Sequence, residues 1–230
     1  MNTIIEKLDG QNKIHALEKA ADLIKNGSVV AFPTETVYGL GANGLDEDAC
    51  KKIFDVKRRK RDNPLILHVT NEEMVRNLSS EITEDQKKLM DNLWPGPLTI
   101  IFKKSDKVND VVSCGGNTVA IRNPSDEIAR FLIDKSNCPI AAPSANKSGR
   151  PSPTNAQDVY SDMQGEIEMI LDGGSCNIGI ESTVVDLTEK PYTILRPGFY
   201  TKEDLEEYLD EVVYDKSLID SKTIPKSPGQ

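Results

Sequence analysis

Apolar and polar positions follow one another in short blocks along most of the chain. Residues 13–26 carry apolar side chains at helical spacing, and Gly27 follows at the point where a helix is expected to stop. Residues 28–32 (SVVAF) form a short apolar block that ends at Pro33, which predicts a buried strand. The chain therefore opens on a helix followed by a strand.

The same alternation continues downstream. Further helices are predicted over 46–56, 71–78, 83–93 and 125–135 and after Thr154, and strands over 65–69, 98–102, 118–122, 138–143, 167–171, 182–187 and 192–196. Residues 105–117 read as a polar connection, and 201–220 as one acidic helix. Alternating strands and helices predict an α/β fold with a mixed sheet. We expect one domain over residues 1–213 and a polar tail over 214–230.

Charge is distributed unevenly along this pattern. The chain has 28 Lys+Arg against 37 Asp+Glu, a net charge of −9, which argues against a general nucleic-acid binder. Residues 201–220 hold eight Asp/Glu and two Lys, so −6 of the −9 lies there. Residues 57–61 (KRRKR) are instead five consecutive cations. Global acidity therefore does not describe the local surface around this run.

Bulk features exclude several classes of protein. No apolar run approaches the length that spans a bilayer, and the N-terminus lacks the apolar segment of a signal peptide. The four cysteines, Cys50, Cys114, Cys138 and Cys176, form no C-x-x-C pair, which favours free thiols in a reducing cytoplasm. With only two histidines, a histidine-rich metal site is not expected, and we predict no metal site built by the protein alone.

Three loops next to predicted strands are rich in groups that bind ligands. Residues 33–44 (PTETVYGLGANG) offer threonine hydroxyls and glycines but form no Walker motif; they are either a ligand loop or a plain strand-to-helix turn. Residues 57–65 suit an anion such as a triphosphate, although a charge run considered alone favours a solvated loop, and an RNA-phosphate patch is a further alternative. Residues 142–149 follow a strand end, where α/β sheets bind ligands, yet their polar groups also suit loop backbone.

Little in the sequence indicates a catalytic nucleophile. His68 lies inside a predicted strand and points to the opposite face from Leu67 and Val69, as structural histidines also do. No Ser/His/Asp triad and no pair of carboxylates for acid–base catalysis is evident. We therefore predict no protein nucleophile.

Six motifs, taken together, resemble the signature of the YrdC family. They are 33–41 (PTETVYGLG), Lys57-x-Arg59 with 63–65 (NPL), 94–99 (WPGPLT), 143–149 (PSANKSG), 182–186 (STVVD) and 195–198 (LRPG). They occur in family order and cover roughly residues 15–213. No single block is decisive, but six in register are highly specific.

The resemblance implies a twisted mixed β-sheet flanked by helices, with a concave ligand-binding cavity. It implies an L-threonylcarbamoyladenylate synthase, a nucleotidyltransferase that joins L-threonine, bicarbonate and ATP into threonylcarbamoyl-AMP and releases pyrophosphate. Mg²⁺ would accompany the ATP. A downstream threonylcarbamoyl transferase would use the product to make threonylcarbamoyladenosine in tRNA, and the protein itself would make at most a weak tRNA contact.

Site residues follow from the same resemblance, position by position. L-Threonine would be held by Thr36, His68, Arg122, Ala142 and Ser182. ATP would be held by Lys57, Arg59, Asn63, Thr118, Ser144, Ser152 and Arg196.

Two departures and two alternatives accompany this interpretation. Many relatives have Lys-Gly-Arg-Pro where this chain has 57–60 (KRRK), and 224–229 resembles the start of a linker that longer relatives use to reach a second domain. An RNA-binding module of the same fold would use the basic run without catalysis, but the global acidity weighs against it. A hydrogenase-maturation subunit would need zinc-binding and acylphosphatase-like segments, which this chain lacks.

Overall fold

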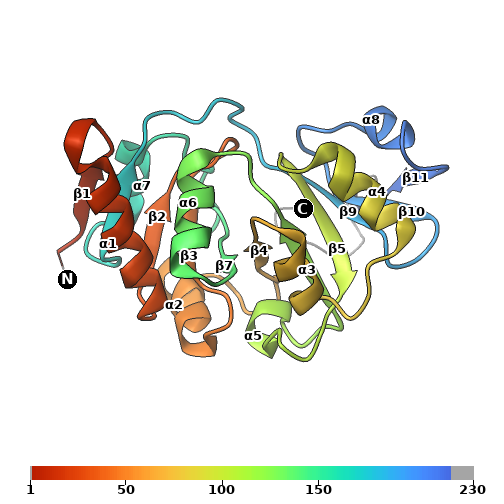
Figure 1. The fold of residues 1–230 in the computed structure, drawn as a ribbon, viewed down its shortest axis with the longest axis horizontal. Helices are drawn as coiled ribbons and strands as arrows, with labels where there is room; N and C mark the ends of the chain where they lie inside the picture. Colours follow the sequence, from red (N-terminus) through yellow and green to blue (C-terminus); the bar gives the residue numbers. More distant parts are fainter. Residues whose placement is uncertain (1, 219–230) are drawn as a thin grey trace.

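A computed structural model describes residues 2–218 as a mixed sheet with helices on both faces (Figure 1). The helices are α1 (Lys13–Lys25), α2 (Glu47–Lys57), α3 (Glu72–Leu78), α4 (Glu84–Leu93), α5 (Asp110–Ser113), α6 (Glu127–Ser136), α7 (Ala156–Met163) and α8 (Lys202–Glu206), with 3-10 turns at Gly10–Asn12 and Lys216–Leu218. The strands are β1 (Ile4–Lys7), β2 (Val30–Phe32), β3 (Gly39–Asn43), β4 (Ile66–His68), β5 (Leu98–Lys103), β6 (Thr118–Arg122), β7 (Ile140–Ala141), β8 (Met169–Asp172), β9 (Thr183–Asp186), β10 (Tyr192–Arg196) and β11 (Val212–Tyr214). No helix within the described range is both long and apolar enough to cross a bilayer.

Strands from all parts of the chain meet in one sheet. Among the described residues the order is β1-β8-β2-β3-β7-β4-β6-β5-β9-β10-β11. The β4–β6 and β5–β9 pairs are parallel, whereas β4–β7 and β5–β6 are antiparallel. The sheet is therefore mixed, as predicted, and its centre combines strands that are far apart in sequence.

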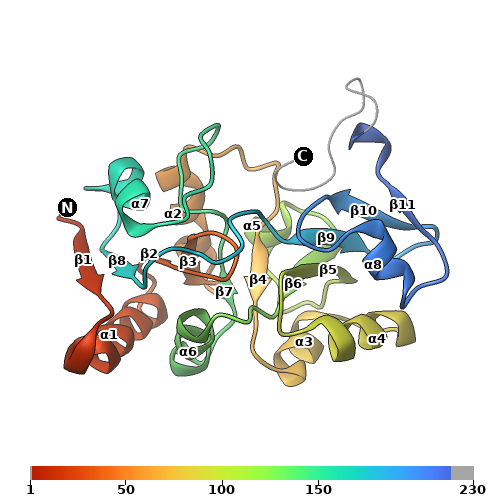
Figure 2. The same ribbon diagram turned by 90° about the horizontal axis from the view of Figure 1, so that it is seen from above.

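Helices cover the sheet in two groups. Figure 2 shows α1, α6, α3 and α4 along one side of the strands, with α2 and α7 on the other. Helices α1 and α6 pack on β2, β7 and β8 through a cluster that includes Leu17, Phe32 and Leu132. A larger cluster packs α2, α3, α4 and α7 against the sheet. Burial of these apolar surfaces is the main stabilising contribution to the fold.

The boundaries of α2 follow directly from the sequence. The Asp46 carboxylate accepts the backbone N–H groups of Asp48 and Ala49, both at 3.0 Å, which caps the first turn. At the other end Arg58 adopts a left-handed conformation with φ of 52° and stops the helix. Consequently Lys57, the last helical residue, is buried, while Arg58 turns outward.

Part of the predicted loop 33–44 is a strand. Residues Gly39–Asn43 form β3, which pairs antiparallel with β2 and with β7. A Cβ atom at Gly41 would lie only 2.4 Å from Phe32 Cε1 and 2.8 Å from Ile140 Cγ2. Glycine is present at position 41 because neighbouring side chains fill the space that a side chain of its own would occupy. A glycine-rich composition that is typical of turns therefore occurs here in a central strand.

The predicted acidic helix over 201–220 is wrong. Within the described part of this range the α-helix covers Lys202–Glu206, and Val212–Tyr214 form β11, which pairs parallel with β10. Val212 is completely buried by this pairing, and β-branched residues favour strands. The predicted domain boundary at 213 falls within β11. Residues 219–230, most of the predicted tail, lie outside the described residues.

One face of the central strands carries a small apolar cluster of its own. It consists of Ile66, Ile101, Ala120, Val184 and Leu195, contributed by β4, β5, β6, β9 and β10. Ile66 also lines the cavity described below. Through Ile66 this cluster reaches the candidate site.

Candidate active site

A cavity of about 440 Å³ lies over the central strands. Its walls come from the loop before β3, the end of α2 with the loop that follows, the edges of β4 and β6, the loop after β7, and the residues at the start of β9 and the end of β10. All three loops selected from the sequence contribute to it. A concave pocket with a few convergent polar groups is the usual form of a small-molecule site.

Two inward-facing cations form one half of the cavity. Lys57 Nζ donates to the carbonyl oxygens of Ser144 and Asn146, the latter at 2.6 Å. Arg59 donates to the carbonyl oxygens of Asn63 and Pro64 at 3.1–3.2 Å. Burial, followed by the charge of Arg59, lowers the pKa of Lys57 from its ordinary value of 10.5 to about 7. We call Lys57, Arg59 and the loop 142–152 the phosphate half.

The basic run thus separates into inward and outward residues. Arg58, Lys60 and Arg61 are exposed, and two of them pair with carboxylates: Arg61 with Asp55 at 3.2 Å and Arg58 with Glu166 at 4.0 Å. Lys57 and Arg59 alternate with them and turn toward the cavity. Both interpretations of the run therefore hold for different residues, since some cations are solvated and others line a pocket.

Arg122 organises the opposite half of the cavity. Its Nη1 donates to Thr36 Oγ1 at 3.0 Å, and its Nη2 lies 2.8 Å from Glu35 Oε1 in an ion pair whose side chains are 5% and 8% exposed. Its Nε has no hydrogen-bond partner among the described residues. His68 is its register partner on β4. We call Thr36, His68 and Arg122 the arginine half.

His68 is buried and uncharged. Burial, together with the charge of Arg122, lowers its pKa from 6.5 to about 3. Its Nδ1 has no hydrogen-bond partner within residues 2–218. Leu67 and Val69 on either side pack into the main core, so His68 faces the cavity as the strand alternation predicts.

The two halves meet at Ser182 and Arg196. Ser182 Oγ lies 2.8 Å from Thr99 Oγ1 and accepts Arg196 Nη2 at 2.9 Å. Burial lowers the pKa of Arg196 to about 10, although the nearby Glu181 carboxylate opposes this shift. Glu181 itself accepts the Ser152 hydroxyl at 2.6 Å. The junction is thus a connected polar network that fixes its own side chains before any ligand arrives.

Comparison with known proteins identifies the family of this chain. The Sua5/YciO/YrdC family model, described as "Telomere recombination", matches residues 22–198. A protein of Pyrococcus abyssi named threonylcarbamoyl-AMP synthase is 52% identical over 215 residues, and one of Bacillus subtilis with the same name is 47% identical over 214. The chain belongs to the Sua5/YciO/YrdC family.

Solved structures of this family show the same fold. Pyrococcus abyssi Sua5, in a crystal structure described as complexed with L-threonine, superposes with a TM-score of 0.95 at 48% identity, covering 99% of this chain and 67% of that one. Escherichia coli YciO superposes with a TM-score of 0.79 at 21% identity, over 90% of this chain and 100% of that one. The predicted family and the predicted twisted mixed α/β fold are both confirmed.

This chain covers only part of its longer relatives. It matches 91% of its own length to 62% of the Pyrococcus abyssi synthase and 93% to 62% of the Bacillus subtilis one. The family model, which matches residues 22–198, includes every residue that lines the cavity.

The structure brings nearly all predicted site residues of this Sua5/YciO/YrdC-family chain together. All five residues predicted for threonine line the cavity, namely Thr36, His68, Arg122, Ala142 and Ser182. Six of the seven predicted for ATP also line it, namely Lys57, Arg59, Asn63, Ser144, Ser152 and Arg196. Their roles remain predictions, but their common location does not depend on the resemblance.

Thr118 is the predicted residue that does not line the cavity. It begins β6 and shares a strand face with Ala120, which packs in the cluster that contains Ile66, and with Arg122, which lines the cavity. It lies four residues before Arg122 along the strand, opposite Lys103 on β5. Thr118 therefore lies on the correct face of the strand but beyond the cavity wall.

Sequence reasoning missed two carboxylates. Glu35 lies between Thr34 and Thr36 in the first motif, and Glu181 immediately precedes the fifth motif, which begins at Ser182. A carboxylate within or directly beside a ligand-binding motif is the signal that could have selected each of them. Glu181 is the acidic side chain that lines the cavity.

Proposed function

We propose that this chain forms threonylcarbamoyl-AMP and pyrophosphate from L-threonine, bicarbonate and ATP. The observation that carries the proposal is the single cavity in which a phosphate half and an arginine half face each other. The relatives named threonylcarbamoyl-AMP synthase and the Sua5 structure complexed with L-threonine support it.

The arginine half suits the amino acid. Arg122 Nε is a buried donor without a partner among the described residues, and a carboxylate accepts such a donor well. His68 Nδ1 and the hydroxyls of Thr36 and Ser182 surround the same space and suit a hydroxyl or an amine. Unpartnered buried polar atoms are costly, so a ligand that satisfies them gains affinity from each one.

The phosphate half suits ATP. Lys57 and Arg59 are held by neutral carbonyl oxygens, so their charges are free to interact with anionic oxygens. Lys57 is anchored on the loop that also supplies Ser144 and Ser152, which places its ammonium among hydroxyls that can donate to phosphate. Binding of phosphate would favour the protonated form of Lys57.

The reaction needs no protein nucleophile. The threonine amine adds to bicarbonate and releases water, which gives a carbamate. A carbamate oxygen then forms a bond to the α-phosphorus of ATP as the bond to the pyrophosphate oxygen breaks. In both steps the protein's contribution would be to hold the reactants in line and to stabilise charge on the phosphoryl oxygens, and the presence of Lys57, Arg59 and Arg196 in the cavity lining supports this role for them.

Mg²⁺ is the proposed cofactor, bound together with ATP. Among residues 2–218, no group of three or more His, Cys, Asp or Glu could hold a metal ion. Mg²⁺ in nucleotide sites is commonly held by one or two carboxylates plus substrate phosphates, and Glu181 is the lining carboxylate that fits this arrangement. When bound, Mg²⁺ offsets negative charge on the phosphates.

The remaining parts of the proposal concern location and partners. The free thiols of Cys50, Cys114, Cys138 and Cys176 support a reducing compartment such as the cytoplasm. The product would pass to a transferase that modifies tRNA. Two of the three outward cations in the basic run are paired with carboxylates, which supports at most a weak direct contact with tRNA.

Pyrophosphate release tests the proposal. The protein is incubated with Mg-ATP and bicarbonate, with and without L-threonine, and pyrophosphate is measured. We expect release that depends on threonine, with L-serine and D-threonine as comparison substrates. Folded protein that binds ATP but releases no pyrophosphate with threonine would contradict the proposed function.

A further inference from the structure

Buried charges are compensated differently in the two halves of the cavity. The hydrogen bonds of Lys57 and Arg59 go to neutral oxygens of the chain. Arg122 instead forms an ion pair with Glu35, with both side chains buried. The phosphate half thus presents positive charge, whereas the arginine half contains a buried pair of opposite charges.

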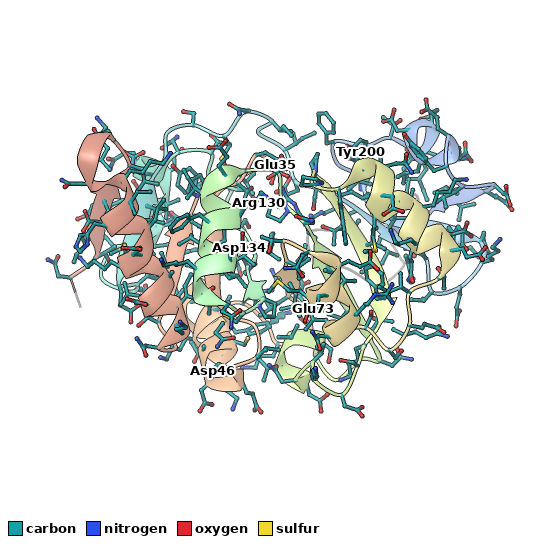
Figure 3. All side chains as sticks on the ribbon, viewed as in Figure 1. Glu35, Asp46, Glu73, Arg130, Asp134 and Tyr200 are labelled. Atoms are coloured by element: carbon teal, nitrogen blue, oxygen red, sulfur yellow. The ribbon has the colours of Figure 1, made fainter. Side chains whose placement is uncertain are left out.

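Glu35 is placed behind Arg122 rather than in the cavity wall. It does not line the cavity, and its side chain is 8% exposed. Its backbone carbonyl accepts Ile178 N–H at 2.9 Å, and the carbonyl of the adjacent Thr36 accepts Gly179 N–H at 3.1 Å. These bonds fix the loop from the far side. Figure 3 shows Glu35 beside the end of α6.

The charge state of this group is well defined. Burial raises the pKa of Glu35, but the charge of Arg122 and its contact outweigh burial, so the pKa is lowered overall and the carboxylate stays ionised. The neighbouring Asp126 carboxylate caps α6 through the N–H groups of Ile128 and Ala129, at 2.9 and 3.0 Å, where the helix dipole offsets its charge. The charges of Glu35 and Arg122 cancel each other as a pair, and neutral His68 adds no charge.

These charges match the charges of the proposed ligands. ATP carries several negative charges and faces uncompensated cations, whereas an amino acid is a zwitterion whose charges also sum to zero. We propose that Glu35 is a specificity-determining residue, which makes the arginine half selective for a zwitterionic amino acid over a simple carboxylate of the same shape. This inference rests on the proposed function, because it concerns how threonine is distinguished at that site.

The physical reason is electrostatic. A carboxylate ligand bound to Arg122 is repelled by the Glu35 carboxylate on the other side of the guanidinium, since charges interact strongly in a buried site. The ammonium of an amino acid is attracted by the same carboxylate. Glu35 therefore weakens binding of an anion and partly restores binding of the zwitterion, even though it touches neither ligand.

The test compares L-threonine with (R)-3-hydroxybutyrate, which is threonine without its amino group. Dissociation constants are measured by calorimetry, and by competition for the weaker ligand. In the unmodified protein we expect threonine to bind at least tenfold more tightly. Glu35→Gln preserves the size of the side chain and removes its charge, so we expect that preference to fall about tenfold, or about 1.4 kcal/mol. Glu35→Asp should restore it.

The ratio of the two dissociation constants separates specificity from damage. General loosening of Arg122 would weaken both ligands by the same factor, and that result, or undetectable hydroxybutyrate binding in Glu35→Gln at unchanged threonine affinity, would overturn the inference. Glu73→Gln, which removes an exposed carboxylate on α3, is the matched control. If Glu35→Gln does not fold, the unmodified protein can still overturn the inference. A dissociation constant for hydroxybutyrate within threefold of that for threonine would exclude selectivity for the zwitterion. Failure to bind threonine at all would instead contradict the proposed function.

Discussion

Replacement of Lys57 by methionine should change how the stability of the protein depends on pH. Lys57 is 2% exposed and its pKa is lowered to about 7, chiefly by burial. The folded protein thus binds this proton less tightly than the unfolded chain does. Between pH 7 and pH 10 the unfolded state holds more protons, so stability rises with pH over this window.

The size of the effect follows from the window. Each pH unit between the two pKa values is worth about 1.4 kcal/mol. At pH 7 the amine in the folded protein is already half deprotonated, so from pH 7 to pH 9 the unmodified protein should gain about 2 kcal/mol that Lys57→Met does not gain. The variant leaves the acceptors at Ser144 and Asn146 without their donor, but that cost does not depend on pH.

Urea unfolding at pH 7, 8 and 9 measures this difference. Both proteins share all other titrating groups, so subtraction of the two stability curves isolates Lys57. Lys52→Met, on the exposed face of the same helix, is the control and should run parallel to the unmodified protein. If the stability curve of Lys57→Met also ran parallel to that of the unmodified protein, the buried amine would not be the cause of the rise in stability with pH.

Two further substitutions test the site and the fold. Arg59→Ala should raise the dissociation constant of ATP by about tenfold or more and leave that of threonine within twofold, because charge-assisted contacts are worth about 1.5–3 kcal/mol. If calorimetry showed an equal loss of affinity for both ligands, the two halves of the cavity would be assigned wrongly. Gly41→Ala should lower the free energy of unfolding by about 1–3 kcal/mol, because its Cβ would lie 2.4 Å from Phe32 Cε1. Unchanged stability in urea would show that Phe32 moves aside freely.

Much of the fold could be predicted because local signals agree with the tertiary structure. Helix α2 begins after Asp46 and ends within one residue of the predicted range 46–56, and the alternation along β4 places His68 on the cavity side. Local signals fail where packing overrides them. Gly39–Asn43 form a central strand because Phe32 fills the space that a side chain at Gly41 would occupy. Val212–Tyr214 form a strand within an acidic segment that predicts a helix, because they pair with β10.

The site was predictable as a set of residues, but its internal geometry was not. Motifs show which loops carry ligand-binding groups, and the fold brings eleven of the twelve predicted residues to one cavity. They do not show how far a strand extends past the cavity wall, which decides the position of Thr118. Nor do they show which buried cation is paired, because the Glu35–Arg122 contact joins residues 87 positions apart in sequence.

The mixed sheet order also determines when the cavity can first exist during synthesis. The residues that line it extend from Thr34 to Arg196 in the sequence. Because β5 pairs in parallel with β9, Leu98 cannot form its strand contacts until Thr183 has been synthesised. A nascent chain on the ribosome therefore cannot complete the cavity until Arg196 has left the exit tunnel. Ligand capture by stalled chains of increasing length should appear in a single late step. Binding in this cavity would thus report completed folding of nearly the whole domain.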